Sequence, residues 1–373
     1  VSTTHSLVGG VRGAGIAAAG WGIADWSVVG QIAASWVISP VLGGLIAAGF
    51  LYVIKHTITY KRDVLEAANR MVPVLVAVMA WAFATYLMLK GVKKIVAVTF
   101  PVALLIGVAI AVVVYMMMRP YIARLTARLD NHKASVNELF TVPLIFAAAL
   151  LSFAHGANDV ANAVGPLAGI NEAIAEGGIS AKAGIPLWVM AVGAIGISLG
   201  LALYGPKLIR TVGSEITELD TMRAFCIAMA AAITVIIASQ LGLPVSSTHI
   251  AVGGVFGVGF LREYIKSSYA RMLEDIRDHH VEDDPEAVEE FLAQFEAADV
   301  SMKGDMLRNM KGQASADRLL GKQERRGLRR VHRVELVKRN LLLRIAAAWI
   351  ITVPIAAVLA AMFFFMIRGM LLP

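Results

Sequence analysis

A single aspartate inside a long apolar stretch is the residue of this chain best suited to carry chemistry. Asp159 lies in residues 153–162 (FAHGANDVAN), between the apolar runs 144–151 and 163–170. A carboxylate at such depth costs roughly 2.5–3.5 kcal/mol on membrane-insertion scales, and ionisable residues there usually mark an ion or substrate pathway. Because Asn158 stands beside it and Na⁺ takes oxygen ligands, we predict a Na⁺ site at Asn158 and Asp159. The alternative is that Asp159 caps a helix inside a bundle, a role that is compatible with cation binding.

A second polar segment, residues 244–249 (PVSSTH), has the features of a helix start that binds an anion. Pro244 ends the preceding helix, and serine and threonine are good caps for the next one. The free N–H groups and the positive dipole end of a helix N-terminus suit a tetrahedral oxyanion. No Lys or Arg lies in this segment, so co-bound cations must balance the charge of the anion. The alternative is that these hydroxyls bond back to helix carbonyls or hold helices together.

Most of this second segment occurs twice. Residues 1–15 match residues 245–259 at ten of fifteen positions. Farther along, residues 34–39 (ASWVIS) resemble residues 348–352 (AWIIT), and a proline follows closely in both copies. The first copy ends at a basic loop, and the second Trp-containing span begins at the same side of the membrane. We therefore expect the two copies to have opposite topology.

Inverted repeats are the usual build of secondary transporters, whose sites lie near the membrane midplane and use discontinuous helices. Each of the polar segments adjoins a short, glycine-rich apolar stretch. We expect alternating access by rocking of one repeat against the other. The sequence predicts re-entrant or broken helices at residues 1–5, 156–162 and 244–249.

The composition places these segments in an all-α polytopic membrane protein. Hydrophobic residues make up 58% of the chain and charged residues 16%, far from the usage of soluble domains. The apolar runs are long and continuous rather than alternating, which favours helices over strands. The net charge of +7 reports basic cytoplasmic loops and a lipid bilayer rather than a nucleic-acid partner. The predicted spans are 28–54, 71–89, 95–118, 140–170, 185–205, 224–243 and 341–367.

The distribution of basic residues orients the chain and divides it into five parts. The loops 55–70 and 119–138 are placed in the cytoplasm by the positive-inside rule, although the basic link 90–94 must then be external. The hydrophilic insert 262–340 is also placed inside, as cytoplasmic helices with Val288, Leu292 and Phe295 at helical spacing. Its basic end can touch anionic lipid, or the insert can be a solvated hairpin. The predicted parts are the end of a first repeat (1–54), linking spans and loops (55–139), a second repeat (140–261), the insert (262–340) and a final span (341–373).

The remaining side chains with reactive groups give weaker evidence of function. His5, His155 and His249 are predicted as packing or supporting groups around the polar segments, with proton transfer as the alternative. Ser246, His249 and Asp159 invite comparison with a hydrolase, but the sequence has no nucleophile elbow and no zinc motif such as HExxH. We therefore predict that the protein is not an enzyme and has no cofactor. The single cysteine, Cys226, is a small packing residue.

At these residues the chain resembles the inorganic phosphate transporter (PiT) family, in its bacterial form. The family carries a GANDVAN motif and a later PVS[S/T]TH motif in each half, and residues 156–162, 244–249 and 1–5 match three of these four motifs. The resemblance implies uptake of inorganic phosphate in symport with Na⁺ or H⁺ across the inner (plasma) membrane. It implies a cation site at Asn158, Asp159 and Asn162. It also implies that phosphate is surrounded by hydroxyls of both copies: Ser2, Thr3, Thr4, Ser246, Ser247 and Thr248.

The family pattern also sets further expectations. Asp159 precedes Ser246 by 87 residues, so a first-half GANDVAN copy is expected about as far upstream of Ser2. We expect the sequence to be part of a longer protein, and this part alone not to transport. A sulfate-carrying member, a non-transporting anion sensor or scaffold, and a homodimer remain open.

Overall fold

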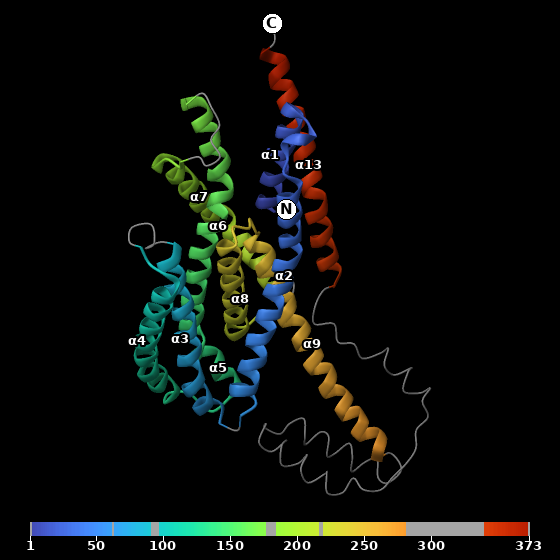
Figure 1. The fold of residues 1–373 in the computed structure, drawn as a ribbon. Coiled ribbons are helices and arrows are strands. Elements are labelled where there is room, and N and C mark those ends of the chain that lie inside the picture. The colour runs from blue at the N-terminus through green and yellow to red at the C-terminus, as the bar shows by residue number, and fades with distance from the viewer. Residues whose placement is uncertain are drawn as a thin grey trace.

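The computed structural model describes residues 2–61, 63–90, 97–176, 184–215, 219–280 and 339–371. Within these residues every regular element is helical and no strand occurs. Seven helices of the described part of the chain are long and apolar enough to cross a membrane, and they correspond one to one with the predicted spans. The all-α, multi-pass prediction is therefore confirmed. The helices form one elongated bundle, with α13 at one end and α9 extending from the other (Figure 1).

Two helices open the chain. Helix α1 (Thr3–Ala19) is capped by Ser2 and ends at Gly20, whose φ of +80° lies in the left-handed region that favours glycine. Helix α2 (Trp26–Ile54) follows after the short turn η1 (Trp21–Ile23), and the carboxylate of Asp25 accepts from two N–H groups of its first turn. The π-helix η2 (Lys55–Thr59) extends α2 to the loop before α3.

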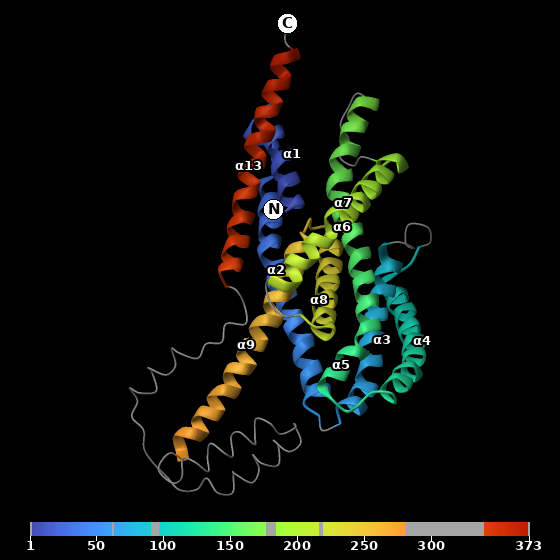
Figure 2. The same cartoon turned by 180° about the vertical axis from the view of Figure 1, so that it is seen from behind.

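A helical hairpin packs against η2, α6 and α8. Helices α3 (Val64–Lys90) and α4 (Phe100–Thr126) lie side by side, and the short α5 (Lys133–Leu139) closes this end of the bundle (Figure 2). The side chain of Asn131 accepts from the N–H groups of Val64 and Leu65, so the loop before α5 caps α3. Through this cap and the packing of α3 on α4, the helices α3, α4 and α5 form one unit.

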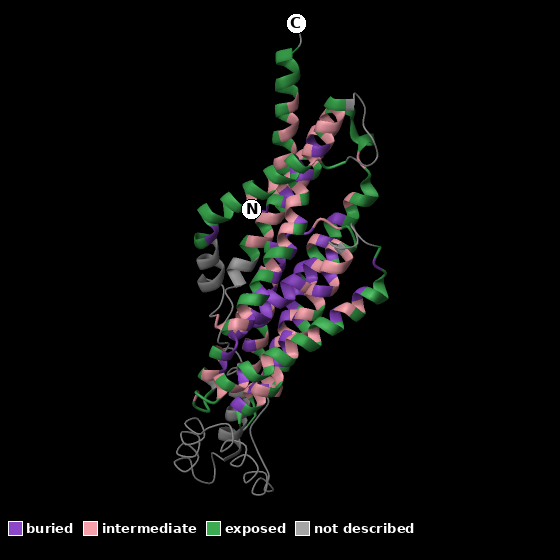
Figure 3. Ribbon diagram, turned by 90° about the vertical axis from the view of Figure 1, so that its left-hand side faces the viewer, coloured by how far each residue is buried: buried purple, intermediate pink, exposed green. Residues whose placement is uncertain are grey.

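The second half contains α6 (Thr141–Glu176), α7 (Leu187–Glu215), α8 (Thr221–Gln240), α9 (Ser247–His280) and α13 (Arg339–Leu371). Helix α8 is the centre of the core: it packs against α6, α2 and α9, and most of its side chains are buried. Burial concentrates in the middle of the bundle, while α7 and α13 are largely exposed (Figure 3). Apolar exposed helices of this length are expected to face lipid.

Several helices are longer than the spans that the sequence predicted. Helix α3 begins at Val64 instead of residue 71, and α7 continues through Pro206 to Glu215. Helix α9 runs through the predicted start of the insert at residue 262 and ends at His280. The polar ends of these helices have helical propensity although they lack the apolar run that marks a span. Residues 281–338, which include Val288, Leu292 and Phe295, lie outside the described residues.

The helices of the sequence repeat exchange partners. Helix α1 packs along α13, and α9 packs along α2 (Figure 1). Each contact depends on glycines that let two backbones approach: a Cβ atom at Gly13 would lie 2.0 Å from the carbonyl oxygen of Ala357, and one at Gly257 would lie 2.1 Å from that of Gly44. Small residues have this role where membrane helices cross closely. The helix that contains the first block of each copy therefore packs against the helix that contains the second block of the other copy.

Candidate functional site

Asp159 lies in the middle of α6, and the prediction of a helix break at residues 156–162 is wrong. Helix α6 is continuous from Thr141 to Glu176. The polar side chains of this segment find partners on neighbouring elements, so the backbone keeps its helical hydrogen bonds. The alanine and valine residues between them are compatible with a helix. The sequence prediction treated polarity as a sign of a break, whereas here it marks the face that meets other helix ends.

The break at residues 244–249 is present. Gly242, with φ of +69°, ends α8 in a Schellman motif, in which its own N–H donates to the Ser239 carbonyl and the Leu243 N–H to the Ala238 carbonyl. Pro244 prevents a return to helix. Ser246 then caps α9, with its hydroxyl accepting from the His249 N–H at 3.4 Å. The sequence thus specifies both the end of one helix and the start of the next.

The start of α1 has the same construction. The hydroxyl of Ser2 accepts from the His5 N–H at 3.4 Å, and its carbonyl accepts from the Ser6 N–H at 3.0 Å. The capping serine and the histidine three residues later occupy equivalent positions in both copies. The capping serines Ser2 and Ser246 are both buried, whereas the next two positions differ: Thr3 is exposed and Thr4 buried, but Ser247 is buried and Thr248 exposed. The repeated sequence therefore produces the same helix cap in both copies, but not the same exposure of the hydroxyls that follow it.

Asp159 meets the start of α9. The hydroxyl of Ser247 donates to Asp159 Oδ2 at 2.9 Å, and His155 Nδ1, one turn earlier on α6, lies 2.9 Å from the same oxygen. The ring of His155 also contacts the Ser247 hydroxyl. The Asp159 side chain stays 19% exposed, so a cation can reach it. The proximity of a carboxylate and hydroxyl oxygens fits the oxygen ligation of a hard cation.

Asn158 joins this carboxylate to two further helices. With its amide oriented to satisfy all neighbours, it donates to Asp159 Oδ1 (3.2 Å) and to the Val245 carbonyl (3.1 Å), and it accepts from the Ser239 hydroxyl (3.1 Å). Ser239 in turn is hydrogen-bonded to the side chain of Tyr86 on α3. Tyr86 is almost fully buried. A polar chain therefore runs from α3 through α8 to the carboxylate on α6.

Asn162 connects the same helix to the other copy of the repeat. Its side-chain amide donates to the Thr4 hydroxyl on α1 at 3.3 Å. One turn of α6 thus contacts the starts of both α1 and α9. Of the predicted residues, Asn158, Asp159, Asn162, Thr4 and Ser247 come together directly. Thr3 and Thr248 are exposed at their helix starts, and Ser2 and Ser246 act as helix caps.

The three predicted histidines separate into two groups. His155 contacts Asp159, as a supporting group would. His5 and His249 instead stack on tryptophans, His5 on Trp36 and His249 on Trp349, with centroid distances of 3.7 Å in both cases. Sequence reasoning missed Tyr86, Ser239 and the tryptophans as neighbours of the site. The two tryptophans could have been identified from the sequence, because each occurs in the second block of the repeat.

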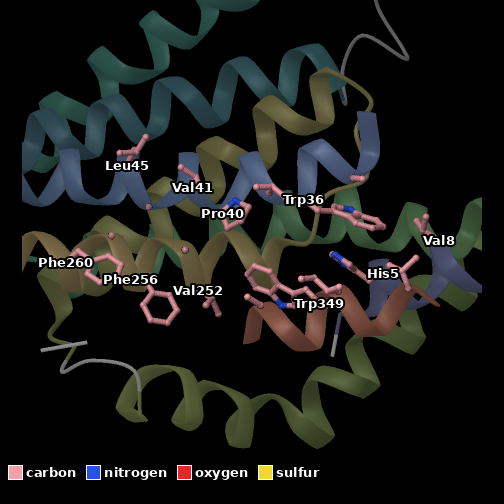
Figure 4. Close-up of a pocket in the computed structure, with 18 of the residues that line it drawn as sticks. His5, Val8, Trp36, Pro40, Val41, Leu45, Val252, Phe256, Phe260 and Trp349 are labelled. Atoms are coloured by element: carbon pink, nitrogen blue, oxygen red, sulfur yellow. The ribbon is translucent and has the colours of Figure 1, made fainter. Parts of the chain in front are cut away.

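A separate cavity of about 1020 Å³ lies between α1, α2, α9 and α13. Figure 4 shows His5, Trp36 and Trp349 near one end of it, and Phe256 and Phe260 at the other. Its wall is apolar apart from a few side chains, and neither Asn158 nor Asp159 lines it. An apolar wall does not offer the hydrogen bonds that a hydrated anion gives up on binding. The polar site is therefore the contact of α6 with the two helix starts.

We expect Ser239→Ala to weaken the polar site. The substitution removes the donor to the buried amide of Asn158, and an unsatisfied buried polar group costs about 1–3 kcal/mol. Cation affinity should fall by about fivefold or more, since each 1.4 kcal/mol is tenfold. The measurement is the Na⁺ dependence of thermal stability in detergent.

Ser198→Ala is the matched control, because among the residues that the structure describes that exposed hydroxyl bonds only to the Ala194 carbonyl of its own helix. Equal Na⁺ dependence in wild type and Ser239→Ala would show that the chain from Tyr86 does not support the site.

These features define a class: a multi-pass helical membrane protein whose polar groups gather at helix starts within the bundle, as in secondary transporters. The chain belongs to the phosphate transporter family, whose model matches residues 1–360. It is similar to the "Putative phosphate permease" of Helicobacter pylori strain J99, at 52% identity over 373 residues, covering 98% of this chain and 70% of the relative. A protein of the same description from Pyrococcus abyssi is 34% identical over 264 residues, covering 70% of this chain and 64% of the relative.

A solved structure extends the comparison to three dimensions. The structure titled "The sodium-dependent phosphate transporter" matches with a TM-score of 0.73 and 28% identity, covering 100% of this chain and 74% of that chain. The resemblance of the sequence to the family is therefore confirmed, as is the fold of a multi-pass membrane transporter.

Proposed function

We propose that the protein imports inorganic phosphate by symport with Na⁺, with phosphate at the starts of α1 and α9 and Na⁺ at Asn158 and Asp159. The family and the sodium-dependent relative support phosphate as substrate and Na⁺ as coupling ion. One observation carries the residue assignment. A single turn of α6 reaches Ser247 through Asp159 and Thr4 through Asn162.

This contact gives the coupling a physical basis. Two helix N-termini supply N–H groups and hydroxyls to an anion, but no fixed positive charge. A cation held by the adjacent carboxylate lowers the cost of bringing phosphate into the membrane, and phosphate does the same for the cation. Each ion thus raises the affinity of the site for the other, as reciprocal linkage requires. Inverted topology of the two repeats would place both helix starts at the same depth.

The test is uptake of radiolabelled phosphate by vesicles that contain the purified full-length protein. An inward Na⁺ gradient should drive accumulation, whereas an equal K⁺ gradient should not. Proton coupling is the alternative that the His155–Asp159 contact favours, and a pH gradient without Na⁺ would then suffice. Excess sulfate that abolished uptake would indicate a sulfate carrier. Phosphate binding without any accumulation would indicate a sensor or scaffold instead.

We expect Thr248→Val to raise the phosphate KM about fivefold. The substitution keeps the shape of the side chain and removes an exposed hydroxyl from the first turn of α9. A net hydrogen bond is worth about 1 kcal/mol, and the variant should fold because this hydroxyl is not buried. Thr57→Val, which removes an exposed hydroxyl bonded to the Val53 carbonyl, is the control. An unchanged phosphate KM in Thr248→Val would remove this residue from the anion site.

A further inference from the structure

Four aromatic rings form a row across the start of the two repeated helices. Trp36 stacks on His5 (centroids 3.7 Å apart, planes at 29°), His5 faces His249 (4.7 Å, 50°), and His249 stacks on Trp349 (3.7 Å, 22°). Both histidines are buried, with 3% of their surface exposed. The row contains one histidine and one tryptophan from each copy of the repeat. Only its central pair joins the two copies.

The row lies next to the helix starts. Each histidine follows its capping serine by three residues, so its ring sits one turn into the helix. The ring of His5 also contacts the Ser2 hydroxyl, with 2.9 Å between Nδ1 and Oγ. Trp36 is fixed at the same place, because its indole N–H donates to the Pro244 carbonyl at 3.0 Å. Movement of the His5 ring would therefore move the start of α1, and movement of the Trp36 ring would move the start of α9.

The central pair connects helices that are otherwise held by different partners. Helix α1 packs chiefly along α13, and α9 chiefly along α2. The contact of His5 with His249 joins the two helix starts directly, in addition to the links that Trp36 and α6 make to both of them. Buried Nδ1 of His249 has no hydrogen-bond partner in the described part of the chain, so this ring is held by stacking rather than by a polar bond.

We propose that His5 and His249 are positioning residues for the anion: the ring row fixes the separation of the two helix starts so that both can contact one phosphate. This inference rests on the proposed function, since it concerns the same site. The imidazoles act through Ser2 and Ser246 and do not touch the anion. Stacking, and not the polar character of the ring, is what the role requires of His249.

The test compares His249→Ala with His249→Phe in the full-length protein. Phosphate affinity is measured directly by titration calorimetry in detergent, and uptake by vesicles is measured in parallel. His249→Ala should weaken phosphate binding roughly tenfold, the order expected for an aromatic pair, with a smaller change in maximal uptake. His249→Phe keeps an aromatic ring on Trp349 and should restore most of the affinity.

His56→Ala is the matched control, because the His56 ring also contacts an aromatic ring, that of Tyr52 with centroids 3.9 Å apart, but is exposed and lies in η2, beyond the end of α2. Phosphate affinity of His249→Ala equal to wild type would overturn the inference, as would equal losses in the Ala and Phe variants. If His249→Ala does not fold, the Phe variant and His5→Phe decide, and weak binding by both would also overturn it. Wild-type protein that binds phosphate but does not accumulate it would contradict the proposed function alone.

Discussion

Replacing Asp159 with asparagine is expected to abolish Na⁺-dependent phosphate uptake, with a loss of about 100-fold at low Na⁺. The carboxylate accepts from Ser247 and Asn158 and lies beside His155. Asparagine keeps the size of the side chain but removes the negative charge that would offset a bound cation. Bonds to charged groups are worth about 1.5–3 kcal/mol, which corresponds to roughly 10- to 150-fold in affinity. Because the anion depends on that cation, the phosphate KM should rise as well.

The measurement is the Na⁺ concentration for half-maximal phosphate uptake in vesicles. Glu66→Gln is the matched control, because Glu66 is an exposed carboxylate paired with Arg70 on α3, away from the site. Uptake in Asp159→Asn that kept the Na⁺ dependence of wild type would remove Asp159 from the coupling site. Thermal unfolding of both variants establishes that the loss is not a loss of folded protein.

Replacing Gly257 with leucine is expected to prevent α9 from packing on α2. Even a Cβ atom at this position would lie 2.1 Å from the carbonyl oxygen of Gly44, and backbone cannot rotate away as a side chain can. Overpacking typically costs 1–3 kcal/mol, and the two helices must separate to admit the larger side chain. We expect a fall in the unfolding temperature of several degrees and weakened phosphate binding, since the start of α9 moves with the helix.

The control for this substitution is Gly49→Ala on α2. A Cβ atom there meets nothing within 4 Å, and alanine is favoured over glycine inside a helix by about 0.5–1 kcal/mol. That variant should be as stable as wild type or slightly more stable. An unfolding temperature of Gly257→Leu within a degree of wild type would show that α2 and α9 do not depend on this close approach.

The spans were predictable because each is a long apolar run, and the break before α9 because Gly242, Pro244 and Ser246 each favour it through local backbone chemistry. The break in α6 was predicted wrongly. Asn158 and Asp159 have the same sequence character whether they interrupt a helix or project from an intact one. Only their partners on α8 and α9 decide between these outcomes, and those partners are distant in sequence.

Ser239 and Tyr86 were missed for a related reason. Each lies in an apolar span, outside the two blocks that match between the copies of the repeat. Their role depends on the packing of α3 and α8 against α6, which the sequence pattern does not specify. The histidines and tryptophans of the ring row, in contrast, recur at matching places in both copies. Their proximity could therefore have been predicted by considering the two blocks of the repeat together.

The exchange of partners between the two repeats limits how the molecule can move. Helix α1 is locked to α13 and α9 to α2 through contacts between backbones, which tolerate little sliding. A motion that swung one repeat as a unit away from the other would have to open both of these contacts. The pieces expected to move as rigid bodies are therefore mixed pairs, each with one helix from either copy, and all three ring contacts of the row, from Trp36 through His5 and His249 to Trp349, cross the boundary between these pairs.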